Sequence, residues 1–164
     1  MNVISKTTLK NQLTKNRKKA LNSFFSKDHR LELVSEFHGK VWINDSKATD
    51  IGASAFSLEN TKGPIIWIVG ESKVKRDLDF VFEIVVSKVD QIIYYGNYET
   101  HLKYKFGSFL KYAHVNDIKE AVKVALENQI DNSTILFSPA CTSFHSHENY
   151  KTRGDYFKFL LRTI

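Results

Sequence analysis

The stretch PIIWIVG, residues 64–70, decides the fold that this sequence predicts. It is a continuous apolar run, without the alternation of a half-exposed strand. A short run of this kind is typical of a strand covered on both faces, as in a parallel sheet between two layers of helices. The segments on either side are therefore expected to alternate between helix and strand.

The segments that follow this strand have that alternation. Their hydrophobic periods predict a helix, a strand, a short helix, a strand, an amphipathic helix, a strand and a closing helix, at 77–89, 91–96, 99–106, 109–115, 117–129, 133–140 and 148–164. Strands joined through helices indicate parallel pairing with right-handed crossovers.

The segments before the strand predict a helix and a hairpin. Residues 48–60 place Ile51, Ala55 and Leu58 on one side of a helix. Residues 30–37 and 40–45 alternate apolar with polar positions around His38-Gly39, which predicts a β-hairpin. The expected fold is an α/β, Rossmann-like, three-layer domain whose mainly parallel sheet has about six strands and is preceded by this hairpin.

The chain of 164 residues suits one domain, and its charge is unevenly distributed. Residues 1–30 hold eight Lys/Arg and one acid, whereas the remaining 134 residues hold 16 basic and 17 acidic side chains. We expect residues 1–25 to be a basic linker, with a helix over 6–25, and residues 26–164 to be the domain. A basic arm can also bind phosphate backbones, so strongly salt-dependent nucleic-acid binding is one alternative function.

The apolar segments and the single cysteine indicate the cellular compartment. No apolar run approaches the length of a membrane span, and the N-terminus lacks the apolar core of a secretory signal. Cys141 has no partner for an internal disulfide, which is natural in a reducing cytoplasm. We read Cys141 as a small buried residue in a tight turn rather than as a nucleophile.

Polar side chains gather where the predicted strands end, at 44–49, 70–77, 96–100 and 138–149. In parallel α/β sheets, ligands bind at this carboxyl edge. In NDSKAT (44–49), Asp45, Lys47 and Thr49 alternate along what reads as an extended stretch, so we expect them to point to the same side. A carboxylate suits a ribose hydroxyl, and an ammonium suits a carboxylate or phosphate. The alternative is a helix N-cap beside a solvated lysine, the cap being Ser46, Thr49 or Asp50.

Several familiar motifs are absent or weak. The sequence has neither a P-loop nor a G-x-G-x-x-G after a strand, so no loop predicts a nucleotide site alone. His145, His147 and Glu148 are a weak candidate for a metal site, because no other spacing completes a tetrahedral ligand set.

Three stretches together resemble one family. HRLELV (29–34), INDSKAT (43–49) and SPACTSF...NYKTRGDYF (138–157) are similar to the C-terminal domain of the Mur ligases of peptidoglycan synthesis, and specifically to the member that adds D-glutamate. The resemblance runs from about Arg17 to the C-terminus. It implies an ATP- and magnesium-dependent ligase in which the L-alanyl carboxylate of UDP-N-acetylmuramoyl-L-alanine is phosphorylated and then attacked by the D-glutamate amine.

The resemblance also implies roles for individual residues. Arg30 would lie near the nucleotide phosphates and Asp45 at the ribose. Lys47, the candidate catalytic residue, and Thr49 would lie at the amino-acid end of the site. The remaining candidates for the D-glutamate pocket are Ser143, Phe144 and Tyr150.

The loop after PIIWIVG departs from the family pattern. The family continues with a second glycine and then a lysine that grips D-glutamate, whereas GESKVKRD (70–77) has Glu71 and Val74 at these positions. The resemblance leaves the flanking Lys73 and Lys75 as the candidates for that contact.

The resemblance does not extend to the UDP-binding and P-loop domains of the ligases, which hold most of the ATP and magnesium contacts. We expect this chain not to hydrolyse ATP or form the amide bond alone, and to work with the remaining ligase domains. A non-catalytic relic that serves as a binding module is the second alternative, and the altered loop favours it.

Overall fold

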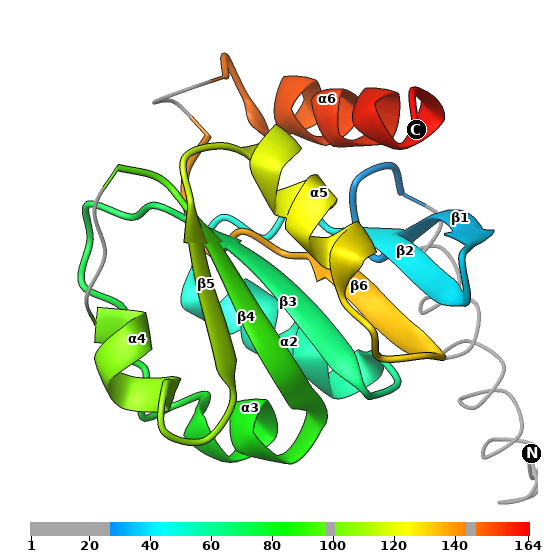
Figure 1. The fold of residues 1–164 in the computed structure, drawn as a ribbon. Coiled ribbons are helices and arrows are strands. Elements are labelled where there is room, and N and C mark those ends of the chain that lie inside the picture. The colour runs from blue at the N-terminus through cyan, green and yellow to red at the C-terminus, as the bar shows by residue number, and fades with distance from the viewer. Residues whose placement is uncertain (1–26, 98–100, 144–146) are drawn as a thin grey trace, which may run out of the picture.

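The computed structural model describes residues 27–97, 101–143 and 147–164. They form one six-stranded sheet in the order β1-β2-β6-β3-β4-β5, mainly parallel, with β1 antiparallel to β2 at one edge (Figure 1). The strands are β1 (Glu32–Phe37), β2 (Lys40–Asn44), β3 (Ile65–Gly70), β4 (Val89–Tyr95), β5 (Lys111–Val115) and β6 (Ser133–Phe137). The predicted α/β class is thus confirmed, with one refinement: β2 of the hairpin pairs in parallel with β6, so the hairpin is part of the sheet.

Five described helices cover the two faces of the sheet. They are α2 (Ile51–Asn60), α3 (Phe82–Lys88), α4 (His101–Phe106), α5 (Ile118–Glu127) and α6 (Tyr150–Arg162). Figure 1 shows α5 and α6 on one face and α2 and α3 on the other. The helix expected at 6–25 lies outside the described residues.

The alternation of side chains along the strands builds two cores, one on each face. In β3, Ile66 and Ile68 join the cluster with α5 and α6. Trp67, between them, joins the cluster with α2, α3 and α4. Because successive residues of a strand point to opposite faces, the unbroken apolar run of β3 supplies both layers at once. This is why the fully buried strand lies in the middle of the sheet.

One predicted helix is shorter than expected. The period of residues 77–89 predicts a helix over the whole segment, but α3 begins only at Phe82. The preceding residues form a turn in which the Phe82 amide donates to Asp79 O. Among the described residues, no helix is long and apolar enough to cross a membrane.

Candidate functional site

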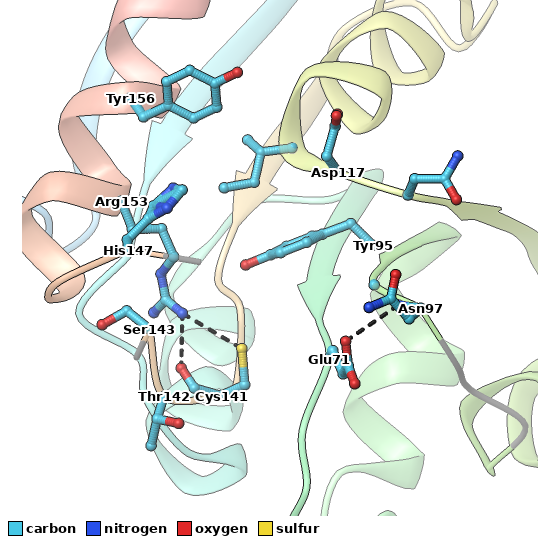
Figure 2. Close-up of a pocket in the computed structure, with 13 residues that line it drawn as sticks. Glu71, Tyr95, Asn97, Asp117, Cys141, Thr142, Ser143, His147, Arg153 and Tyr156 are labelled. Atoms are coloured by element: carbon cyan, nitrogen blue, oxygen red, sulfur yellow. Dashed lines mark hydrogen bonds between the residues drawn. The ribbon is translucent and has the colours of Figure 1, made fainter. Parts of the chain in front are cut away.

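A pocket of about 180 Å³ opens at the carboxyl edge of the sheet (Figure 2). It is lined by residues that follow β3, β4, β5 and β6 and by the beginnings of α5 and α6. Parallel strands bring all these ends to one edge, as the sequence predicted for a ligand site.

Arg153 is a buried cation on one wall of the pocket, with 2% of its surface exposed. Its Nη1 donates to Cys141 O at 2.9 Å, and its Nε and Nη2 donate to Ser46 Oγ and Ser46 O at 2.9 and 2.7 Å. These partners are neutral, and Arg153 has no salt bridge with any carboxylate that the structure describes. The wall therefore keeps a net positive charge.

Tyr95, at the end of β4, extends across the pocket toward Arg153 (Figure 2). Its hydroxyl is buried and finds no oxygen or nitrogen partner among the described residues. The neighbouring group is the Cys141 thiol, a weak hydrogen-bonding partner. Burial and the neighbouring Cys141 raise the pKa of Tyr95 well above its usual value. The phenol therefore stays protonated and can donate a hydrogen bond.

Glu71 stands on the opposite wall, directly after β3. Its carboxylate accepts a hydrogen bond from the Asn97 amide at 3.2 Å. Gly96 makes this approach possible, because its φ is +140° and an added Cβ would lie 2.5 Å from the Glu71 Cβ. Asp117, which caps α5 by accepting from the Glu120 amide, lines the same pocket.

Residues 45–48 form a turn, whereas the sequence predicted an extended stretch over 45–49. The Ala48 amide donates to Asp45 O at 2.9 Å, and the Ser46 amide donates to the Asn44 side chain at 3.1 Å. The predicted extended conformation of this stretch is therefore wrong. Local hydrogen bonds close the turn without glycine or proline. The alternative N-cap is confirmed at Asp50, whose carboxylate accepts from the Ala53 amide.

Asp45 is buried and its carboxylate is fully engaged inside the domain. It accepts hydrogen bonds from Ser57 Oγ, from Ser138 Oγ at 2.8 Å and from the Leu31 amide at 3.2 Å. Burial raises its pKa to about 6, even though these donors and the nearby Arg30 charge oppose the shift. Asp45 thus joins β2, β6, α2 and the turn before β1. The predicted contact with a ribose stays a prediction, and this geometry favours a positioning role.

Lys47 and Tyr150 lie together beside this turn. The Lys47 ammonium lies over the Tyr150 ring, 5.3 Å from its centroid. Tyr150 O accepts from Ser46 Oγ at 2.8 Å, which ties the start of α6 to the same turn. Thr49 follows Lys47 by two residues, lies just before α2 and is half-buried. Arg30 lies in the turn before β1. The next residue, Leu31, donates its backbone amide to the Asp45 carboxylate.

Ser143 lines the pocket beside Arg153, and its predicted contact with D-glutamate stays a prediction. Phe144 and His145 lie outside the described residues. The remaining lysine candidates, Lys73 and Lys75, are exposed and do not line this pocket.

In the loop after β3, the cationic side chain that turns inward is that of Arg76, which was not among the predicted site residues. Its guanidinium donates to the carbonyls of Gly70 and, at 3.2 Å, Ala140, and so joins the ends of β3 and β6.

Arg153, Tyr95 and Glu71 are the site residues that the candidate set omitted. Tyr95 and Glu71 stand at or after a predicted strand end, which is the signal that would have identified them. Arg153 lies in a helix, 107 residues from Ser46, and no local pattern marks its contact.

The described residues contain no group of three His, Cys, Asp or Glu side chains that could hold a metal ion. The magnesium contacts were expected mainly in the other ligase domains, and this expectation stays a prediction. Burial and the Arg153 charge lower the pKa of His147, so its imidazole is neutral near pH 7.

The chain is similar to curated ligases. It is 36% identical over 143 residues to the UDP-N-acetylmuramoylalanine–D-glutamate ligase of Porphyromonas gingivalis, and 35% identical over 141 residues to that of Chlorobium limicola. Each match covers 86% of this chain, and the two cover 32% and 30% of the relatives. The chain thus spans about a third of the length of these relatives. No family model matches.

Solved structures have a similar fold. The Escherichia coli FolC protein in complex with ADP superposes with a TM-score of 0.56 and 14% identity, over 84% of this chain and 32% of that one. A murein peptide ligase from Psychrobacter arcticus gives a TM-score of 0.56 and 13% identity, over 89% and 32%. At these identities the likeness concerns the fold alone.

Proposed function

From the homology of this chain to part of the UDP-N-acetylmuramoylalanine–D-glutamate ligases, in the Mur ligase family, we propose that it is the amino-acid-binding, nucleotide-closing domain of such an ATP-dependent ligase. The observation that carries the proposal is the 36% identity over 143 residues. The similarity of the α/β fold to FolC and to a murein peptide ligase supports the proposal. Residues 26–164 would be this domain, and residues 1–25, which lie outside the described part, would link it to the rest of the enzyme.

The proposed reaction joins the D-glutamate amine to the L-alanyl carboxyl group of UDP-N-acetylmuramoyl-L-alanine. ATP first converts this carboxylate to an acyl phosphate, and attack by the amine then releases phosphate. The contribution of this chain would be to position reactants and stabilise charge, which a domain that closes over the site can provide. Lys47, Thr49 and Ser143 would face the amino acid, and Arg30 the nucleotide. The UDP-sugar, ATP and magnesium would be held mainly by the other ligase domains.

The arrangement of the carboxyl edge supports this division. The turn with Lys47, beside Tyr150, and the pocket with Ser143 are joined by Ser46, which contacts both Tyr150 and Arg153. A rigid connection between two substrate-facing regions is what accurate positioning requires. The exposed Lys73 and Lys75 would contact the substrate only if the loop moved on closure.

An NMR titration of the chain with D-glutamate, and separately with L-glutamate, tests the proposal. We expect larger shifts with the D-enantiomer, at the backbone amides of Lys47 and Ser143, and their loss in Lys47→Ala. The matched control is Lys62→Ala, which removes an exposed lysine from the turn between α2 and β3. Equal responses to both enantiomers would overturn the D-glutamate assignment and favour a non-catalytic binding module.

A further inference from the structure

The pocket in Figure 2 carries opposite charges on opposite walls. Arg153 and the Tyr95 hydroxyl lie on one side, and Glu71 lies across from them. Charges in a small, partly enclosed site interact more strongly with a ligand than charges on an open surface. The arrangement therefore favours a molecule that carries both signs of charge.

The positive wall is suited to a carboxylate. A buried guanidinium without an acidic partner is costly, and an anionic ligand would compensate that cost. Arg153 is in this state among the described residues, and the Tyr95 hydroxyl adds a protonated donor that lacks an oxygen or nitrogen partner there. Ser143 supplies a third polar group to the same pocket. Charge-assisted hydrogen bonds of this kind are the strong ones.

The negative wall is suited to an ammonium group. Glu71 is held in place by the Asn97 amide and by its packing on Gly96, so its carboxylate is oriented before any ligand arrives. The Asn97 bond uses one carboxylate oxygen, Oε2. An ionised carboxylate has acceptor sites beyond a single bond, so Glu71 can also accept from a ligand.

We propose that this pocket binds a free amino acid as its zwitterion, with a carboxylate at Arg153 and Tyr95 and the ammonium at Glu71. Glu71 is then a specificity-determining residue that rejects ligands without the amine. The proposal rests on the proposed function, because it assigns D-glutamate to the part of the candidate site that Ser143 lines. It also assigns a use to the acidic residue that departs from the family pattern in this loop.

Three probes test the recognition of the amine. NMR titrations compare D-glutamate with N-acetyl-D-glutamate and with glutarate, which keep the carboxylates and lack the ammonium. We expect both analogues to bind the chain at least about tenfold more weakly than D-glutamate, as the loss of a charged hydrogen bond requires. In Glu71→Gln this preference should shrink to about threefold or less. The control Glu83→Gln, an exposed acid in α3, should keep it.

A variant at the other wall separates the two ends of the pocket. Tyr95→Phe keeps the ring and removes the hydroxyl, so it should weaken D-glutamate and its acetylated analogue by the same factor. Equal binding of D-glutamate and the two analogues would overturn the proposal, as would a Glu71→Gln variant that keeps the preference. The proposed function instead fails if D- and L-glutamate bind alike. Absence of any binding would overturn both.

Discussion

Arg153 and Ser46 are 107 positions apart in the chain, yet they share two hydrogen bonds inside the domain, Nε to Oγ at 2.9 Å and Nη2 to O at 2.7 Å. The same guanidinium donates to Cys141 O at 2.9 Å. One side chain of α6 thus holds the turn after β2 and the loop after β6 in a fixed relation. This relation positions both parts of the candidate site.

Replacing Arg153 by methionine should destabilise the domain strongly. Methionine preserves much of the apolar stem but leaves the buried carbonyls of Ser46 and Cys141 without their donor, at a cost of about 2–4 kcal/mol. Equilibrium unfolding in urea measures the loss. The exposed Arg162, at the end of the same helix, is the control, and Arg162→Met should change the stability by less than about 0.5 kcal/mol. Similar losses in both variants would contradict a specific role for Arg153.

The stability of the chain should depend on pH through Asp45. Its folded pKa is about 6, above the ordinary value of 3.8, so the folded state binds this proton more tightly than the unfolded state. The stabilisation is complete below about pH 4 and is lost as pH rises through 6, by up to about 3 kcal/mol. Urea unfolding between pH 4 and 7 measures it. In Asp45→Asn this component should disappear, and parallel pH profiles of the two proteins would refute the assignment.

Gly154→Ala should destabilise the domain through a contact with His29. An added Cβ would lie 2.2 Å from His29 Nδ1, which itself contacts Asn44 Nδ2 at 2.9 Å. We expect overpacking to cost about 1–3 kcal/mol, although alanine is otherwise the better helix former. In a His29→Ala background the same substitution should be neutral or stabilising. Thermal or urea unfolding of the wild type, the two single variants and the double variant completes this double-mutant cycle. Additive effects on the free energy of unfolding would show that no such contact exists.

Lys88→Met should loosen the contact between α3 and the end of α2. The Lys88 ammonium donates to the carbonyls of Leu58, Glu59 and Thr61, at 3.1, 2.6 and 3.1 Å. A cation at a helix C-terminus satisfies free carbonyls and favourably opposes the helix dipole. We expect a loss of about 1–2 kcal/mol in urea unfolding. Lys62→Met, in the adjoining turn, is the control, and an equally large loss there would rule out a specific cap.

The strand and helix assignments were largely predictable because they depend on local period. The unbroken run of β3 and the amphipathic pattern of α5 both gave the observed elements. The beginning of α3 was not predictable in this way, because the turn before Phe82 is fixed by a hydrogen bond to Asp79 O. The extended conformation predicted for 45–49 failed for another reason: Asn44, Asp45 and Ser46 favour turns, and hydrogen bonds to Asp45 O and to the Asn44 side chain close one here.

The candidate site was predictable at the level of the sheet edge and not at the level of individual contacts. Ser143 lines the pocket, because a residue that follows a parallel strand reaches the carboxyl edge in any such fold. Lys73 and Lys75 follow β3 as well, but they are exposed, and Arg76 takes the inward place. Sequence position alone does not decide which of several neighbouring cations bends toward the strand ends.

The sequence by itself determined the layers of this protein. Burial of an element on one or two faces sets the spacing of its apolar residues, and this spacing can be read directly from the chain. The sequence also determined the edge at which the candidate site residues gather. Only the tertiary structure decided that Arg153, Tyr95 and Glu71 share one pocket and that Asp45 is enclosed by Ser57 and Ser138. These contacts join residues distant in the chain, and their geometry depends on how helices and strands pack rather than on any local pattern.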